Sequence, residues 1–213
     1  MEFLLENILN LVGFLVGLGI GIMSFIGFRN TGSPTLFRLT IAFFSISLGF
    51  FVIWAGYMAE DLVIKAGHLE RWVQTLGIAI QTVGYFFIAF SHSIKSFFPK
   101  SSYFRSVGIL PFFLVSSVQL EHLFRSVSFI LLAYGAIETM LSYIDNKNKG
   151  AISVSVGLAL LALGEFLGWY SFVFPESILY TVSMVIKIGG LIALFIPVSK
   201  VPLTKIKFDE GLE

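Results

Sequence analysis

Three ionisable side chains, Glu138, Glu165 and Lys187, lie in stretches of the sequence where a charge is costly. Each interrupts an otherwise uncharged run that is long enough to cross a lipid bilayer as a helix. Such a crossing takes about 20 apolar residues, and a charge at the bilayer centre costs about 2.5–3.5 kcal/mol on insertion scales. These three residues are therefore the first candidates for chemistry.

The spacing of Glu165 and Lys187 predicts that they face each other. Glu176 marks a turn between two apolar runs, and the two residues stand at equal distances along the chain before and after it. In an antiparallel helical hairpin both would lie about 16 Å below the same membrane surface at 1.5 Å per residue. Because a lone buried charge would be neutralised, we predict an ion pair between them. Counted from Arg125, Glu138 falls at about 20 Å on the same scale and is expected as a second partner or a rival.

A site with two carboxylates and one ammonium supports three interpretations. One carboxyl group can hold a proton, as a proton relay requires. The same pair can instead fix helix register or orient a partner subunit without moving anything. Lys187 in the last helix also resembles the lysine that binds retinal in microbial rhodopsins, which would imply a retinal Schiff base, although Ser183 stands where the counter-ion aspartate of that family would be.

The composition requires membrane-spanning helices to carry this site. Of the 213 residues, 56% are hydrophobic and 13% are charged, against about 25% charged in soluble domains. The net charge of +1 argues against a nucleic-acid partner, and the absence of cysteine excludes thiol chemistry and disulfides. The sequence predicts an all-α integral membrane protein with a single membrane domain over residues 1–213. Seven predicted spans, the fourth of them short, lie at 7–28, 39–59, 72–94, 106–120, 126–144, 150–175 and 177–199.

The basic residues predict the orientation through the positive-inside rule. With seven spans and the N-terminus outside, Lys65, Arg71 and Arg125 face out, and the C-terminal tail 200–213 is cytoplasmic. The basic residues then predicted inside, in the plasma membrane, are Arg29, Arg38, Lys95, Lys100, Arg105, Lys147, Lys149, Lys200, Lys205 and Lys207. If the fourth span did not cross, this bias would nearly vanish.

An internal repeat links the two halves of the chain. The pattern L-G-x-F-x-x-W occurs at Leu48–Trp54 and again at Leu163–Trp169, an offset of 115 residues, and the third and seventh spans align at an offset of 106. The first and fifth spans align loosely around Gly19 and Gly135. We therefore expect a 3+1+3 layout: one repeat at about 7–95, a linker helix at about 104–122 and a second repeat at about 126–199. An odd linker keeps both halves in the same orientation.

This layout resembles that of SWEET-type sugar transporters and, more distantly, that of the seven-helix microbial rhodopsins. The resemblance concerns the order of helices only. The repeat places Gln81 where Lys187 stands and Phe50 where Glu165 stands. It therefore predicts a polar core of Glu138, Glu165, Lys187 and Gln81, with the Gln81 amide facing the ion pair across the pseudo-axis.

Glycines at helical spacing predict close helix packing. Gly13, Gly17 and Gly21 share one face of the first span, and small residues at this spacing allow helices to approach, either within the bundle or between protomers. The sixth span has a similar face formed by Gly157, Gly164 and Gly168.

The functional expectation is movement of a small solute or a proton through the polar core. The alternative is a non-transporting membrane subunit, a sensor or scaffold that acts as a homo-oligomer or with a partner subunit. No nucleophile with an adjacent base, metal signature or nucleotide-binding loop occurs, so we expect neither an enzyme nor a cofactor. The histidines are His68, His92 and His122, and the predicted topology separates them between the two membrane ends.

Overall fold

Six long helices make up the computed structural model of the chain, which describes residues 2–63, 67–93, 117–146, 149–171, 174 and 178–199. All six are long and apolar enough to cross a membrane. They are α1 (Glu2–Thr31), α2 (Pro34–Val63), α3 (Gly67–Ser93), α4 (Ser117–Asn146), α5 (Lys149–Tyr170) and α6 (Leu179–Val198). The part of the predicted fourth span before Ser117 lies outside the described residues.

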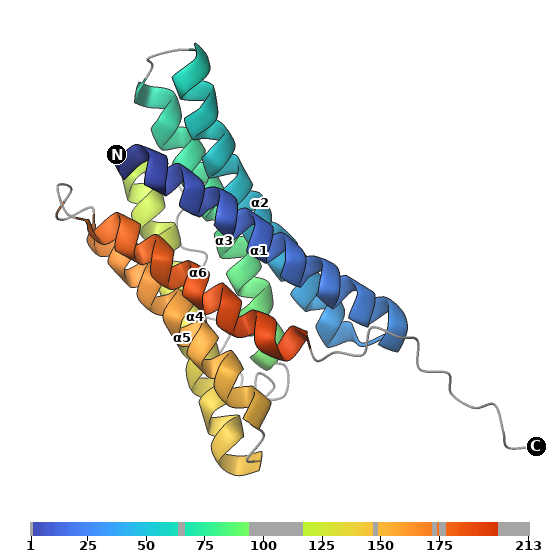
Figure 1. Ribbon diagram of the computed structural model, residues 1–213. Coiled ribbons are helices and arrows are strands. Elements are labelled where there is room, and N and C mark those ends of the chain that lie inside the picture. The colour runs from blue at the N-terminus through green and yellow to red at the C-terminus, as the bar shows by residue number, and fades with distance from the viewer. Residues whose placement is uncertain are drawn as a thin grey trace, which may run out of the picture.

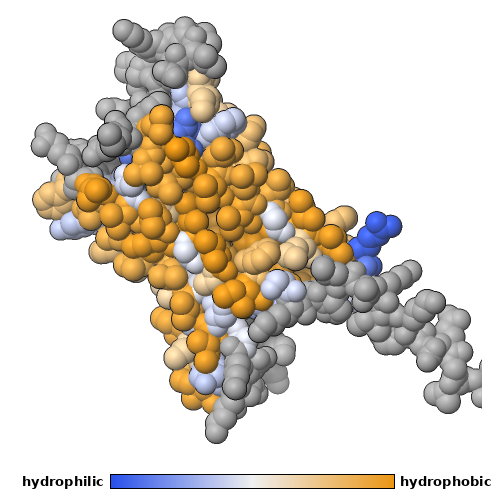
Figure 2. Space-filling model, in the orientation of Figure 1, coloured by the Kyte–Doolittle hydropathy of each residue, from blue (hydrophilic) through white to orange (hydrophobic). Residues whose placement is uncertain are grey.

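The outer surface of the bundle is apolar, as a lipid environment requires. Leu15, Phe86, Ile137 and Ile192, on four different helices, are half exposed or more. Figure 2 shows that hydrophobic residues cover most of the visible face, with hydrophilic groups toward its margins. In lipid every backbone polar group must be satisfied within its own segment, and long helices satisfy this condition. The chain is therefore built as a polytopic membrane protein.

The helices form a closed ring in chain order. Each helix contacts its two neighbours in the sequence of elements, and α6 returns to contact α1. Figure 1 shows α1 and α6 side by side and running in the same direction. We call the end of the bundle where α1 begins the Glu2 end, and the end where α1 stops the Thr31 end.

The neighbours α3 and α4 also run in the same direction. Thr82 Oγ1 of α3 lies 2.9 Å from Ser128 Oγ of α4. Further toward the C-terminus of both helices, Ala89 of α3 lies beside Gly135 of α4. Contacts that advance together along both helices define a parallel pair. Consequently α3 ends at the Thr31 end, whereas α4 begins at the Glu2 end.

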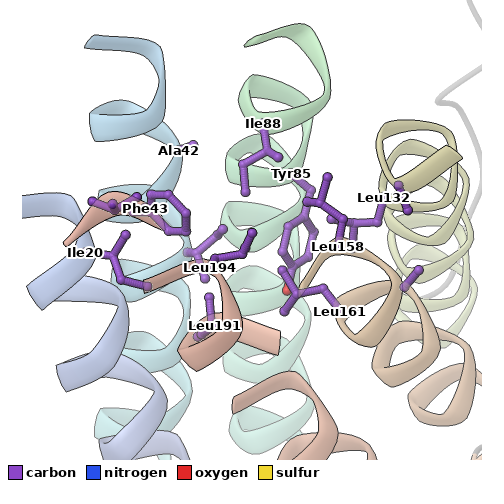
Figure 3. Close-up of a cluster of buried hydrophobic side chains, with 14 of the residues drawn as sticks. Ile20, Ala42, Phe43, Tyr85, Ile88, Leu132, Leu158, Leu161, Leu191 and Leu194 are labelled. Carbon is purple, nitrogen blue, oxygen red and sulfur yellow. The ribbon is translucent and has the colours of Figure 1, made fainter. Parts of the chain in front are cut away.

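All six helices contribute to one apolar core, which lies between the middle of the bundle and the Thr31 end. Figure 3 shows the buried side chains converging from every helix. They include Ile20, Phe43, Tyr85, Ile88, Leu132, Leu158, Leu161, Leu191 and Leu194. Toward the Glu2 end, the buried positions are instead largely polar.

The predicted glycine face of α1 packs within the bundle, against α2. A Cβ built on Gly17 would lie 3.2 Å from Ser47 Cβ, and one built on Gly13 would lie 3.0 Å from the Phe50 ring. Gly21 lies in the same way against Phe44. The small residues therefore let α1 and α2 approach closely.

Contacts between helices recur in the two halves of the chain. A Cβ built on Gly49 would lie 2.5 Å from Gln81 Cγ, and a Cβ built on Gly164 would lie 2.5 Å from Lys187 Cγ. Gly164 and Lys187 are the residues that the predicted repeat pairs with Gly49 and Gln81.

A second recurrence concerns the aromatic rings between the first two helices of each half. The Phe14 and Phe51 ring centroids lie 5.2 Å apart, and those of Phe129 and Phe166 lie 5.7 Å apart. These pairs are related by the offset of 115 residues for both helices. When the sequences of α1 and α4 are aligned by these ring contacts, the alignment is therefore shifted by one residue from the predicted match around Gly19 and Gly135.

The start of α4 corrects the predicted boundary between linker and second repeat. Residues 117–122, which the sequence assigned to the linker helix, belong to the single helix Ser117–Asn146. The prediction treated Glu121 and Arg125 as loop residues because they are charged. The structure instead places both inside α4, and Arg125 is therefore not an outward-facing loop residue.

Candidate functional site

The predicted pair of Lys187 and Glu165 is present in the interior of the bundle. Lys187 Nζ lies 2.6 Å from Glu165 Oε1, and the two side chains are almost completely buried. Glu165 stands five residues before the end of α5, and Lys187 eight residues after the start of α6. At 1.5 Å per residue, this places the pair about 8–12 Å from the Glu2 end.

Two further charges extend the pair into a network. Arg125 Nη1 lies 3.4 Å from Glu165 Oε2, and Arg125 Nη2 lies 2.9 Å from Glu121 Oε1. The Arg125 Nε also donates to Glu121 Oε1, at 3.0 Å. We call these four residues, Glu121, Arg125, Glu165 and Lys187, the charge network.

The charge network alternates in sign and sums to zero. Its order is Glu121, Arg125, Glu165 and Lys187, so each inner charge contacts an opposite charge on both sides. Arg125 is 1% exposed and Glu165 is fully buried. Taking single ions out of water costs several kcal/mol each, and only good geometry with further hydrogen bonds compensates this cost. The alternation supplies that compensation across α4, α5 and α6.

Glycines on α5 make the space that these long side chains occupy. A Cβ built on Gly168 would collide with Arg125 Nη1, and one built on Gly164 would meet the Lys187 stem. The glycine face predicted for the sixth span therefore admits one cation from α4 and one from α6. Gly157, on the same face, packs against Leu194 instead.

Aromatic side chains border the network. The Arg125 guanidinium carbon lies 5.8 Å from the centroid of the Tyr180 ring, which favours the cation electrostatically. Tyr85 on α3 is fully buried near Glu165, and its hydroxyl has no hydrogen-bond partner among the described residues. At the adjacent margin, Thr181 Oγ1 lies 3.5 Å from Glu6 Oε1 and links α6 to α1.

Gln81 is buried at the position in the first half that corresponds to Lys187. It is 1% exposed, and neither its Nε2 nor its Oε1 has a hydrogen-bond partner among the described residues. Ser183 Oγ, beside Gly168 and the Arg125 side chain, is also buried without such a partner. Buried polar atoms are nearly always satisfied by protein or by ordered water. These two side chains therefore indicate where water or a polar solute can be held.

Glu138 does not belong to the charge network, contrary to the sequence prediction. It is partly exposed and lines a separate cavity with Thr139 and Ser142 near the Thr31 end. The depth estimate for Glu138 took Arg125 as the membrane surface. Because Arg125 is itself buried in α4, Glu138 lies about 20 Å further along the helix, away from Lys187.

Arg125 and Glu121 are the site residues that the sequence analysis missed. Both residues are charged, and charged residues were expected to mark the edges of spans, so both were predicted to lie in a loop. One signal could have found them: an acid and a base four residues apart lie on the same helix face and can pair. The shortness of the run 106–120 was a second indication that the helix boundary lay elsewhere.

The side chains of the charge network are almost completely buried. None of them lines any of four cavities, of about 150–370 Å³, that lie elsewhere among the described residues. Among the described residues there is also no group of three acidic, histidine or cysteine side chains that could hold a metal ion. His122 contacts the Trp169 ring, with the centroids 5.9 Å apart. The chemistry that the site offers is proton exchange among its carboxyl, amine and neighbouring hydroxyl groups.

The chain matches no family model, no curated protein and no solved structure in the three comparisons.

Proposed function

We propose that the chain is a seven-crossing membrane protein with a 3+1+3 layout. The parallel packing of α3 and α4 supports a further crossing between them, because α3 ends at the Thr31 end and α4 begins at the Glu2 end. The intervening residues 94–116 must therefore connect opposite ends of the bundle. A helix of that length would extend about 34 Å, enough to cross the hydrocarbon core.

The recurring contacts support a repeat with its axis along the bundle. The Gly49–Gln81 contact and the Gly164–Lys187 contact fall at corresponding places in two halves that run in the same direction. Parallel repeats of this kind are one of the layouts found in membrane transporters.

The proposed location is the plasma membrane. In the proposed orientation the Glu2 end faces the outside of the cell and the Thr31 end faces the cytoplasm. Placing Arg125 inside α4 strengthens the positive-inside bias, because only Lys65 and Arg71 then remain on the outer side. The charge network then lies in the outer half of the membrane.

The proposed activity is movement of a small solute or a proton through the interior of the ring. The observation that carries this proposal is the distribution of buried polar groups. The half of the interior toward the Glu2 end holds the charge network, together with the unpartnered polar atoms of Gln81 and Ser183. Intramembrane charges that face a bundle interior commonly mark substrate or ion pathways.

Movement along this route requires a change of conformation. The apolar core lies between the charge network and the Thr31 end, and the side chains of the network are almost completely buried. The two halves meet along α3 with α4 and along α6 with α1. We propose that one half moves against the other along these two contacts to open the polar site, as in alternating access.

Flux measurements in proteoliposomes test this proposal. We expect proton or solute flux with the wild type, and at least a tenfold loss in Glu165→Gln and in Lys187→Met. The matched control is Val185→Met, because Val185 faces outward on the same helix as Lys187 and is 53% exposed. Equal flux in the wild type and both network variants would contradict the proposed activity.

A non-transporting membrane subunit is the second candidate, and the enclosure of the network favours it. Four alternating charges that sum to zero and line no described cavity can simply hold α4, α5 and α6 in register. Such a subunit would act as a homo-oligomer or on a partner in the bilayer. It predicts that the network variants lose stability while the wild type itself shows no flux above protein-free liposomes.

A further inference from the structure

Two adjoining cavities lie near the Thr31 end of the bundle, away from the charge network. The first has a volume of about 150 Å³ and the second of about 370 Å³. Val154 of α5 and Pro197 of α6 line both, so the cavities meet at these residues. Figure 1 shows α1 and α2 diverging from α4 and α5 toward this end.

The smaller cavity is apolar and lies between the two halves of the chain. Leu39 and Phe43 of α2 and Ile88 of α3 line it from one half, and Leu194 and Val198 of α6 line it from the other. Its volume is close to that of cavities that bind a molecule the size of benzene. It therefore suits a compact hydrocarbon group.

The larger cavity carries polar groups on one wall. Glu138, Thr139 and Ser142 of α4 line it, opposite Gly150 and Ala151 at the start of α5. A carboxylate accepts hydrogen bonds and forms its strongest ones with charged donors. The polar wall therefore suits a ligand end that donates hydrogen bonds, above all a protonated amine.

We propose that these two cavities form one binding site for a small amphipathic amine. The hydrocarbon body occupies the space between Phe43, Ile88 and Leu194, and the ammonium group lies at Glu138. Ligand sites in proteins typically combine such an apolar wall with a few polar groups that fix orientation. The site is independent of the proposed transport, because it shares no residue with the charge network.

Thermal unfolding of the full chain in nanodiscs tests this site with 2-phenylethylamine as the probe and 2-phenylethanol as the neutral control. A ligand that binds only the folded state raises the unfolding temperature in a saturable way. We expect such a rise with the amine at pH 7, and at least tenfold weaker apparent affinity for the alcohol. Glu138→Gln should weaken the amine at least tenfold and leave the alcohol unchanged.

A second variant separates the site from partition of the probe into lipid. Ala151→Leu places extra volume beside the polar wall and should weaken the amine without changing the unfolding temperature of the free protein by more than a few degrees. A non-saturable shift, or the same amine affinity in the wild type and in both variants, would overturn the proposal. Neither outcome depends on flux, so the result also stands apart from the test of transport.

Discussion

The charge network should behave as one coupled unit when the Glu165–Lys187 pair is removed. At an effective dielectric constant of about 20, charges at the separation of Lys187 and Glu165, 2.6 Å, attract by about 6 kcal/mol, and those of Arg125 and Glu165, 3.4 Å, by about 5 kcal/mol. Desolvation offsets much of this attraction in the intact protein. Removing one partner leaves the desolvation cost of the other charge without the attraction that compensated it.

Each single variant should therefore be strongly destabilised. Glu165→Gln leaves two cations with one carboxylate, and Lys187→Met leaves two carboxylates with one cation. Breaking a buried pair in this way costs about 3–5 kcal/mol. The double variant Glu165→Gln/Lys187→Met restores neutrality, because Glu121 and Arg125 remain paired. Its loss of unfolding free energy should therefore be about 3 kcal/mol smaller than the sum of the two single losses.

The assay is reversible unfolding in mixed micelles. The free energy of unfolding is compared in a double-mutant cycle of the wild type, the two single variants and the double variant. Val185→Met serves as the control for substitution in α6 and should change the free energy by less than about 0.5 kcal/mol. Losses that simply add in the double variant would show that the two side chains do not interact, and would refute the reasoning.

Three other predictions follow from helix packing and topology. Gly168→Ala should destabilise the protein by about 1–3 kcal/mol through the Arg125 guanidinium, whereas Gly189→Ala, with open space around it, should be neutral or stabilising in the same unfolding assay. Gly17→Ile should disrupt the contact with Ser47 and lower the unfolding temperature, whereas Gly19→Ile, which meets nothing within 4 Å, should not. Single cysteines placed at Leu4 and Ser199 should be labelled from opposite sides of the membrane if the chain crosses seven times, and labelling from the same side would indicate an even number of crossings.

The position of the Glu165–Lys187 ion pair could be predicted from sequence because it depends on the number of residues between each side chain and the turn that joins the two helices. Glu165 and Lys187 belong to consecutive helices joined by a short turn, and helical rise alone sets their depths. Interactions between helices distant in the sequence have no such measure. For that reason the contact that Arg125 makes with Glu165 from α4 was not predicted, although the spacing of Glu121 and Arg125 could have indicated their own pairing.

The error at Glu138 has the same physical origin. Charged residues usually end a membrane span because they are costly inside it, and the sequence analysis applied this rule to Arg125. The rule fails where charges neutralise each other in pairs, as Glu121 and Arg125 do. The depth of Glu138 was counted from Arg125 as if Arg125 lay at the membrane surface. The count is therefore wrong by the length of α4 that precedes Arg125 inside the membrane.

The internal repeat stays a prediction, and contacts between helices recur at a few of the positions that it matches. Gly49 against Gln81 and Gly164 against Lys187 are corresponding contacts with different chemistry. The amide and the ammonium occupy corresponding places, so the charge network occurs in the second half only. The complete seven-crossing layout stays a prediction, since residues 94–116 lie outside the described part of the chain.

Access of water to the polar interior tests the central claim most directly. The chain has no cysteine, so Ser183→Cys introduces a single thiol beside the charge network, at a side chain that is fully buried in the enclosed conformation. Labelling of intact membranes with a membrane-impermeant thiol reagent should proceed measurably faster than at the outward-facing control Val182→Cys, because the two halves open the site. A labelling rate at Ser183→Cys no higher than at Val182→Cys would show a permanently dry core and contradict the account.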